Sequence, residues 1–142
     1  MSPERVGAIG SFDHVSLPMQ NTDAMVAFYR SLGLTVAEHP HVVSVYVGKQ
    51  MINLHRPSVW QREEFSLRAP AATPPCGDLC FVWDGDSASL HSLLDEAGAE
   101  IIEGPVAREG GRRAAASSVY TRDPDGNLVE FMIYLERGSH AD

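Results

Sequence analysis

The chain has 142 residues, 44% of them hydrophobic, which is enough for one compact domain with a buried core but not for two ordinary ones. Its formal net charge of −8, without a basic stripe, argues against nucleic acid as a partner because phosphate backbones would be repelled. No apolar run approaches about 20 residues, and the N-terminal segment lacks the hydrophobic core of a signal peptide. We therefore expect a soluble, cytoplasmic protein without a membrane partner.

The first half of the chain predicts one strand, one helix and three further strands. Residues 12–19 alternate polar and apolar side chains as a strand does, and residues 21–34 follow with an N-cap candidate at Asn21 and a stop at Gly33. Between Asn21 and Gly33, apolar residues recur at helical spacing, at Met25, Phe28 and Leu32. Three strands are expected next, over 35–40, 42–48 and 51–57. The order is βαβββ.

The second half of the chain repeats this order. A strand is expected over 78–84, and residues 86–99 predict a capped helix with apolar side chains at Leu90, Leu93 and Leu94. Three more strands are expected over 100–105, 117–123 and 127–134. A duplicated unit of this length buries its open sheet face by pairing with its copy.

The duplication predicts an α+β fold of two tandem βαβββ modules whose curved mixed sheets surround a cleft. A single domain is expected over 11–135, with modules at about 11–57 and 77–135, a connector at 58–76, and tails at 1–10 and 136–142. The connector is long for a structureless link, so we expect it to fold over the pocket or onto a partner subunit through Trp60 and Phe65.

One carboxylate, Glu130, interrupts the apolar segment "NLVEFMIY" near the C-terminus. An unpaired carboxylate is costly to move out of water, so Glu130 requires a cation, a proton or access to solvent. Superposing the two halves matches Glu130 with Asn53 and His14 with Asp78. His55 lies on the same strand face as Asn53. Imidazole and carboxylate groups converging from separate strands would suit a divalent metal ion.

Other interpretations of these residues remain open. Glu130 could pair with Arg108 or Arg112, and His14 could be an ordinary core histidine. Cys80 lies in a strand-like segment and is interpreted as a small buried thiol, since two cysteines four positions apart do not make a disulfide framework. The metal site is favoured because its candidate ligands occupy repeat-related positions.

Several motifs carry a resemblance to a known family. The segments "FDHVSL", "FYRSLGL" and "RDPDGNLVE", in this order within a duplicated βαβββ unit, resemble the vicinal oxygen chelate superfamily. That superfamily includes glyoxalases, fosfomycin-resistance proteins, bleomycin-binding proteins and extradiol dioxygenases. The segments "GKQMINLH", "GDLCF" and "EGPV" are similar to those of small glyoxalase-domain-containing proteins. The resemblance covers roughly residues 11–135, and because this fold hosts many chemistries it does not indicate one reaction.

The resemblance implies metal ligands at four places. His14 and Glu130 match the family pattern. Within "MINLH", Asn53 occupies the usual position while His55 is the better donor, and many relatives carry His where Asp78 stands. The implied metal-ligand set is His14, His55, Asp78 and Glu130, and the divalent ion could be Zn, Ni, Mn or Fe. Glu130 would also be the catalytic base, with Asn53, Trp60 and Tyr120 contacting the substrate.

The activity implied by the resemblance is that of a glyoxalase-like, metal-dependent lyase or isomerase, similar to lactoylglutathione lyase. Such an enzyme uses the metal as a Lewis acid toward two neighbouring oxygens of a small substrate while a carboxylate moves a proton. A glutathione adduct would favour basic residues at the pocket rim, where Arg56, Arg62, Arg68 and the segment 108–113 are candidates. A homodimer in which modules from two chains pair is also implied.

Two alternative functions remain open. An extradiol dioxygenase would need a second His where Asp78 stands, because its Fe(II) is held by two His and one carboxylate. A metal-free protein that binds a small, bleomycin-type drug would agree with the acidic charge and with stacking surfaces at Trp60, Trp83 and Tyr46. A bound stoichiometric metal would favour the lyase over the binding protein.

Overall fold

A computed structural model describes residues 6–135 and has the expected order of elements. The first module contains β1 (His14–Pro18), α1 (Thr22–Ser31), β2 (Thr35–Glu38), β3 (Val42–Val47) and β4 (Gln50–His55). The short helix α2 (Pro57–Trp60) begins the connector. The second module contains β5 (Asp78–Val82), α3 (Ser87–Glu96), β6 (Glu103–Glu109), β7 (Ala115–Arg122) and β8 (Leu128–Tyr134). Of the expected tails, residues 1–5 and 136–142 lie outside the described part of the chain.

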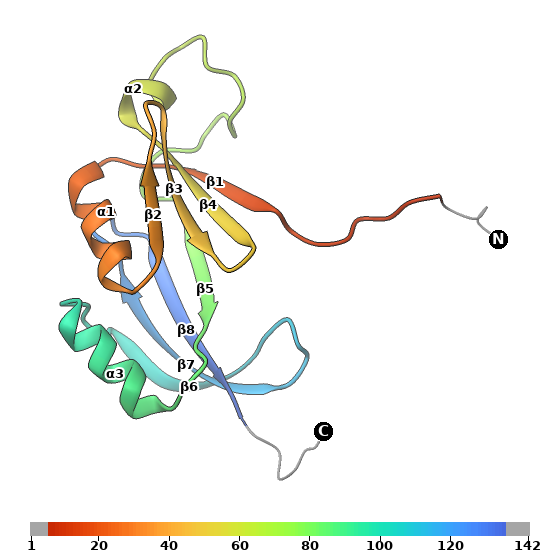
Figure 1. The fold of residues 1–142 in the computed structure, drawn as a ribbon, viewed down its shortest axis with the longest axis vertical. Helices are drawn as coiled ribbons and strands as arrows, with labels where there is room; N and C mark the ends of the chain where they lie inside the picture. Colours follow the sequence, from red (N-terminus) through yellow and green to blue (C-terminus); the bar gives the residue numbers. More distant parts are fainter. Residues whose placement is uncertain (1–5, 136–142) are drawn as a thin grey trace.

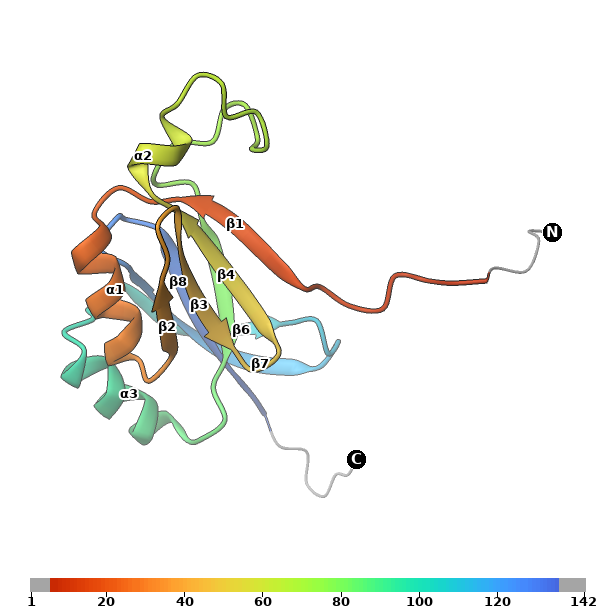
Figure 2. The ribbon, with the colours of Figure 1, turned by 45° about the horizontal axis from the view of Figure 1, so that its top comes forward.

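The two modules form two four-stranded mixed sheets, so the expected α+β class is confirmed. The strand orders are β1-β4-β3-β2 and β5-β8-β7-β6. In each sheet the first strand of the module runs parallel to the last strand, and the other neighbours are antiparallel. Figures 1 and 2 show α1 and α3 on the same side of the molecule. No helix within residues 6–135 is long and apolar enough to cross a membrane.

The helices cover one face of each sheet, and the opposite face carries the candidate site residues. In β4, Ile52 and Leu54 are buried in the core while Asn53, between them, points to the other face. In β8, Val129 is buried in the same core and Glu130 points away from it. A single hydrophobic cluster includes side chains from α1, α3 and both sheets. The two modules therefore share one core.

Strand β6 differs from its expected position. The sequence predicts a strand over 100–105, whereas β6 runs from Glu103 to Glu109. Its second half, beginning at Val106, pairs with β7 after a register shift. The segment that follows Val106 lacks alternating apolar residues, so its strand conformation depends on pairing with β7 and gives no local signal.

A buried carboxylate in the turn between β7 and β8 joins the second module to the first. Asp123 is 5% exposed and accepts a hydrogen bond from the Tyr29 hydroxyl of α1 over 2.7 Å. It also accepts from Nδ2 and the backbone N–H of Asn127, over 2.8 and 2.9 Å. Burial and the neighbouring carboxylate raise the pKa of Tyr29, so its hydroxyl remains a donor. This contact fixes how the modules pack.

The same turn also forms hydrogen bonds with the residues that precede α1. Asp125 accepts hydrogen bonds from the backbone N–H groups of Gln20 and Asn21, over 2.7 and 2.8 Å. Asn21 stands at the N-cap position, but its side chain donates to Asp125 instead of capping α1. The N-cap candidate predicted from sequence is therefore used for contact between modules.

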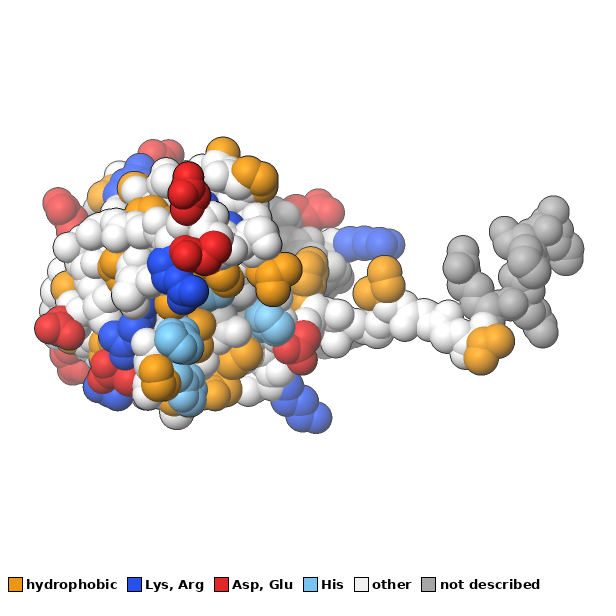
Figure 3. All heavy atoms as spheres, turned by 90° about the horizontal axis from the view of Figure 1, so that it is seen from above, with side chains coloured by type: hydrophobic (Ala, Val, Ile, Leu, Met, Phe, Trp, Pro, Cys, Tyr) orange, Lys and Arg blue, Asp and Glu red, His pale blue; other side chains and the backbone are white. Residues whose placement is uncertain are grey.

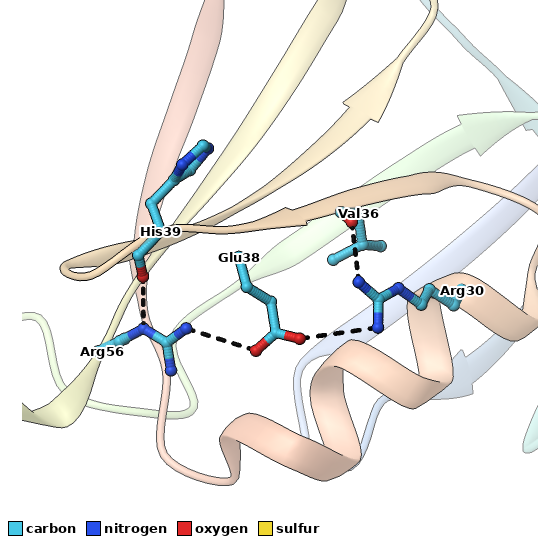
Figure 4. A network of polar contacts seen from close by, with 5 residues as sticks. All are labelled: Arg30, Val36, Glu38, His39 and Arg56. Atoms are coloured by element: carbon cyan, nitrogen blue, oxygen red, sulfur yellow. Dashed lines mark hydrogen bonds and ion pairs between the residues drawn. The ribbon is translucent and has the colours of Figure 1, made fainter.

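Glu38, at the end of β2, links α1 to the segment after β4 (Figure 4). Its carboxylate pairs with Arg30 over 3.7 Å and with Arg56 over 3.4 Å. Arg30 also donates to the Val36 carbonyl over 3.1 Å, and Arg56 donates to the His39 carbonyl over 2.9 Å. Ion pairs near the surface, like these, add little stability.

Residues 6–13 form an extended arm that projects from the body of the molecule and joins it at the start of β1 (Figure 1). Ile9 and Phe12 in this arm are 97% and 77% exposed. In the view from above, hydrophobic side chains follow the arm away from the rest of the protein (Figure 3). Apolar surface exposed in this way is typical of a segment that docks on another surface.

Replacing Asp123 by Ala is expected to lower the free energy of unfolding by about 3 kcal/mol, because the buried donors of Tyr29 and Asn127 lose their charged acceptor. Urea denaturation measures the change. Asp95→Ala, which removes an exposed carboxylate from α3, is the control and should cost less than about 0.5 kcal/mol. Equal stability of the two variants would show that the Asp123 contact does not join the modules.

Candidate functional site

Two parallel strand pairs present the predicted ligands in equivalent ways. In the first sheet His14 lies opposite Met51, so Asn53 stands two positions further along the neighbouring strand. In the second sheet Asp78 lies opposite Leu128, so Glu130 stands two positions further. His14 is thus related to Asn53 as Asp78 is to Glu130. Strand geometry puts the Cα atoms of each pair about 8 Å apart on one face.

The His14 ring is oriented by its neighbour in the chain. Nδ1 of His14 donates a hydrogen bond to Oδ2 of Asp13 over 2.7 Å, and the His14 side chain is 42% exposed. With Nδ1 as the donor, a neutral imidazole would present the lone pair of Nε2 to a ligand. A carboxylate that orients a histidine through its second nitrogen is the usual partner of a metal-binding imidazole.

Asn53 and His55 share a face of β4 but have different surroundings. The Oδ1 atom of Asn53 accepts a hydrogen bond from the Ser44 hydroxyl over 2.8 Å, which fixes the amide. His55 lies opposite Pro18, four positions along from His14 in the register. Four strand positions correspond to about 13 Å, and side chains stand roughly perpendicular to a sheet. One metal ion therefore cannot bind both His14 and His55.

Glu130 lies between β5 and β7, opposite Cys80 on one side and Tyr120 on the other. Within residues 6–135 it forms no ion pair. The two arginines considered as its partners contact tyrosines instead. Nε of Arg108 donates to the Tyr120 hydroxyl over 2.8 Å, and the Arg112 guanidinium lies 4.6 Å from the centre of the Tyr134 ring. Glu130 is thus a half-buried carboxylate available to a ligand.

Cys80 is exposed on this face of the sheet, so the interpretation of Cys80 as a buried thiol was wrong. The sequence pattern of the strand is that of a core element, but the alternation turns Cys80 away from the helices. The pKa of the Cys80 thiol is raised to about 12. The largest cause is partial desolvation of the thiol, and the next is the charge and hydrogen bonding of Glu130. In the metal-free protein the thiol therefore stays protonated at neutral pH and is a poor nucleophile.

The structure does not bring all of the predicted ligands together within one chain. His14 and Asn53 lie on the first sheet, whereas Asp78 and Glu130 lie on the second. Among the residues that the structure describes, no three His, Cys, Asp or Glu side chains are close enough to hold a metal ion. Each module thus carries half of the candidate site.

The connector covers the far end of β4. Trp60 of α2 donates its indole N–H to the Met19 carbonyl over 2.8 Å, and the Phe65 ring lies edge-on to His55 with 5.2 Å between ring centres. Burial, and next the positive charge of Arg68, lower the pKa of His55. Trp60 and His55 both line a cavity of about 490 Å³ under the connector. The connector therefore folds back over the first sheet of its own chain.

The sequence pattern of the glyoxalase/bleomycin resistance protein/dioxygenase superfamily matches residues 11–131. The chain belongs to this superfamily. The resemblance seen in the sequence motifs is thereby confirmed, and residues 11–131 include both modules.

Three relatives illustrate how widely the superfamily is spread. The chain is 34% identical over 134 residues to the glyoxalase domain-containing protein RDO1 of Mycosarcoma maydis, covering 94% of this chain and 73% of the relative. It is 36% identical over 129 residues to the virulence protein STM3117 of Salmonella typhimurium, covering 89% of this chain and 86% of the relative. The crystal structure of STM3117 superposes with a TM-score of 0.79, covering 91% of this chain and 100% of that chain at 34% identity. Metapyrocatechase 2 of Cupriavidus necator is 32% identical over 89% of this chain but only 34% of the relative.

Sequence reasoning missed two neighbours of the predicted ligands. Asp13 precedes His14 in the chain, and an Asp directly before a candidate metal-binding His was a signal available in the sequence. The Cys80 thiol beside Glu130 could not be found in this way, because it depends on the register between β5 and β8.

At pH 8, Cys80 of the metal-stripped protein is expected to react with iodoacetamide at least about tenfold more slowly than Cys76, since only the thiolate reacts. Glu130→Gln removes the adjacent negative charge, lowers the pKa of Cys80 and should speed its alkylation. Cys76 serves as the internal control and should be unaffected. Peptide mass spectrometry follows both sites, and a Cys80 rate that Glu130→Gln leaves unchanged would contradict the assigned contact.

Proposed function

We propose that this chain is a metal-dependent lyase or isomerase of the glyoxalase type, acting on a small substrate with two neighbouring oxygen atoms. The observation that supports it most is the equivalent register of the two parallel strand pairs, which gives each module two polar side chains at related positions. In this proposal His14 and Asn53 of the first module, and Asp78 and Glu130 of the second, surround one divalent ion. Asn53 takes the place of His55, because the register separates His55 from His14.

The donor set suits a divalent ion of intermediate softness. It offers one imidazole whose Nε2 is free, two carboxylates and an amide oxygen. Imidazole favours Zn, Ni or Fe, whereas carboxylate and amide oxygens suit Mn as well. The residues present therefore fit the type of metal implied by the superfamily.

The chain's own residues would divide the remaining chemistry. When bound, the ion would polarise the neighbouring substrate oxygens as a Lewis acid. Glu130 removes a proton from one of the two substrate carbons that carry these oxygens, and returns it to the other carbon. Cys80 and Tyr120 flank Glu130 on the two neighbouring strands, so both lie where they limit how a substrate can approach the carboxylate.

We also infer that a second copy of the chain completes the site. The two halves lie on separate sheets of one chain, and a partner can present its second module to the first module of this one. The apolar arm at residues 6–13, with Ile9 and Phe12 exposed, provides a surface for such a partner. Association would bury this apolar surface and so be favoured by the hydrophobic effect.

The alternatives differ in their requirement for metal. Asp78 stands where an extradiol dioxygenase would need its second His, so the chain's donor set disfavours that chemistry. Metal-free binding of a drug-like molecule draws support from Trp60, whose anchored ring lines a cavity, and from exposed Tyr46. The metal content of the purified protein separates this alternative from the lyase.

The wild-type protein is expected to bind one divalent ion per chain, selected from Zn, Ni, Mn and Fe(II), and to keep it through dialysis. His14→Ala and Glu130→Ala should each weaken metal affinity by at least about tenfold, because each removes a direct ligand. Elemental analysis after dialysis, combined with competition by a metal-sensitive dye, measures both quantities. Asn53→Ala should weaken affinity more than His55→Ala.

His91→Ala, which removes an exposed histidine of α3, is the matched control for these variants and should bind metal as the wild type does. Circular dichroism confirms that each variant is folded. A wild-type protein that binds none of the four ions would contradict the proposed enzyme and favour the binding protein.

A further inference from the structure

Three arginines follow β4, and one of them differs from the others in its surroundings. Arg56 pairs with Glu38 over 3.4 Å, and Arg62 pairs with Glu64 over 3.6 Å. Arg68 forms no ion pair within residues 6–135. The chain has a net charge of −8 and therefore an excess of carboxylates, yet none of the described ones is used to neutralise Arg68.

The Arg68 guanidinium is held in place and partly buried. Its Cζ atom lies 5.9 Å from the centre of the Trp60 ring, and one terminal nitrogen donates to the Ala72 carbonyl. Its Nε atom is buried without a hydrogen-bond partner among the described residues. Because the chain closes off Nε, a ligand can meet only the terminal end of the guanidinium. The other terminal nitrogen there has no hydrogen-bond partner among the described residues, and Arg68 lines a cavity, so this end can donate to an acceptor that arrives with a ligand.

The cavity beside Arg68 has room for such a ligand. It measures about 490 Å³ and is formed by the connector on one side and by β1 and β4 on the other. Trp60, Leu17 and Leu67 supply apolar walls, while Arg68 supplies the positive charge. Ser16 lines the same cavity and lies opposite Asn53 in the β1–β4 register. The cavity therefore extends from Arg68 toward the first half of the candidate metal site.

We propose that this cavity binds a small organic acid, with its carboxylate paired to the Arg68 guanidinium and its carbon body against Trp60. A planar guanidinium offers parallel N–H donors that match a carboxylate, and the flat indole favours an unsaturated or aromatic body. We assign this acid as the substrate of the enzyme, and that assignment rests on the proposed lyase function. The binding itself does not require a metal.

Titration of metal-stripped wild-type protein with benzoate, benzamide and inorganic phosphate tests the assignment by calorimetry. Benzoate should bind saturably, whereas benzamide, which has the same shape but no charge, should bind at least tenfold more weakly. Inorganic phosphate should also bind more weakly than benzoate, because it lacks the apolar body. Tighter binding of phosphate than of benzoate, or equal binding of benzoate and benzamide, would overturn the proposal.

Substitutions in the connector then test whether Arg68 binds the carboxylate of benzoate. Arg68→Gln should weaken benzoate binding at least tenfold, Arg68→Lys should retain part of it, and Arg62→Gln, the matched control, should change it less than twofold. Unchanged binding by folded Arg68→Gln would also overturn the proposal. Since the protein is metal-free, loss of benzoate binding leaves the metal content as a separate test of the lyase function.

Discussion

The buried Asp123 carboxylate determines how the two halves of this protein are arranged. It belongs to the second module, but one of its hydrogen-bond donors is the Tyr29 hydroxyl of the first. The neighbouring Asp125 binds the backbone at the start of α1, so one short turn holds the strand β8 and the helix α1 together. Because a buried carboxylate needs its donors, the modules cannot shift relative to each other without losing these bonds. The shared core then positions the helices on one side and leaves the polar sheet faces free.

This packing has a direct consequence for the candidate site. The polar faces of the two sheets carry equivalent pairs, His14 with Asn53 and Asp78 with Glu130, but the pairs lie on different sheets. Asp13 orients His14, and the Cys80 thiol lies beside Glu130, so each half has supporting contacts within its own module. We therefore describe the chain as carrying two half-sites, which a second copy would bring together. The arm before β1 exposes Ile9 and Phe12, the apolar surface to which the proposal assigns that contact.

Much of the fold could be predicted from the sequence, because it rests on local patterns. Alternation and helical spacing gave the order βαβββ twice, and the repeat matched His14 with Asp78 before any register was known. Contacts between distant segments were not predictable in this way. The turn at Asp123 looks like an ordinary reverse turn until Tyr29 is placed against it. The exclusion of His55 from the ion bound by His14 required the β1–β4 register, and the unpaired state of Arg68 required the fold of the connector.

The central claim is that one metal site combines the first module of one chain with the second module of another. Co-expression of His14→Ala and Glu130→Ala chains, with different tags so that mixed dimers can be isolated, tests it most directly. A mixed dimer has one site with both substitutions and one site with none, so the account predicts one tightly bound metal ion per dimer, whereas each variant alone should bind metal at least about tenfold more weakly than the wild type. Mixed dimers that bind no metal would contradict it, since a site contained within one chain would be damaged in both copies.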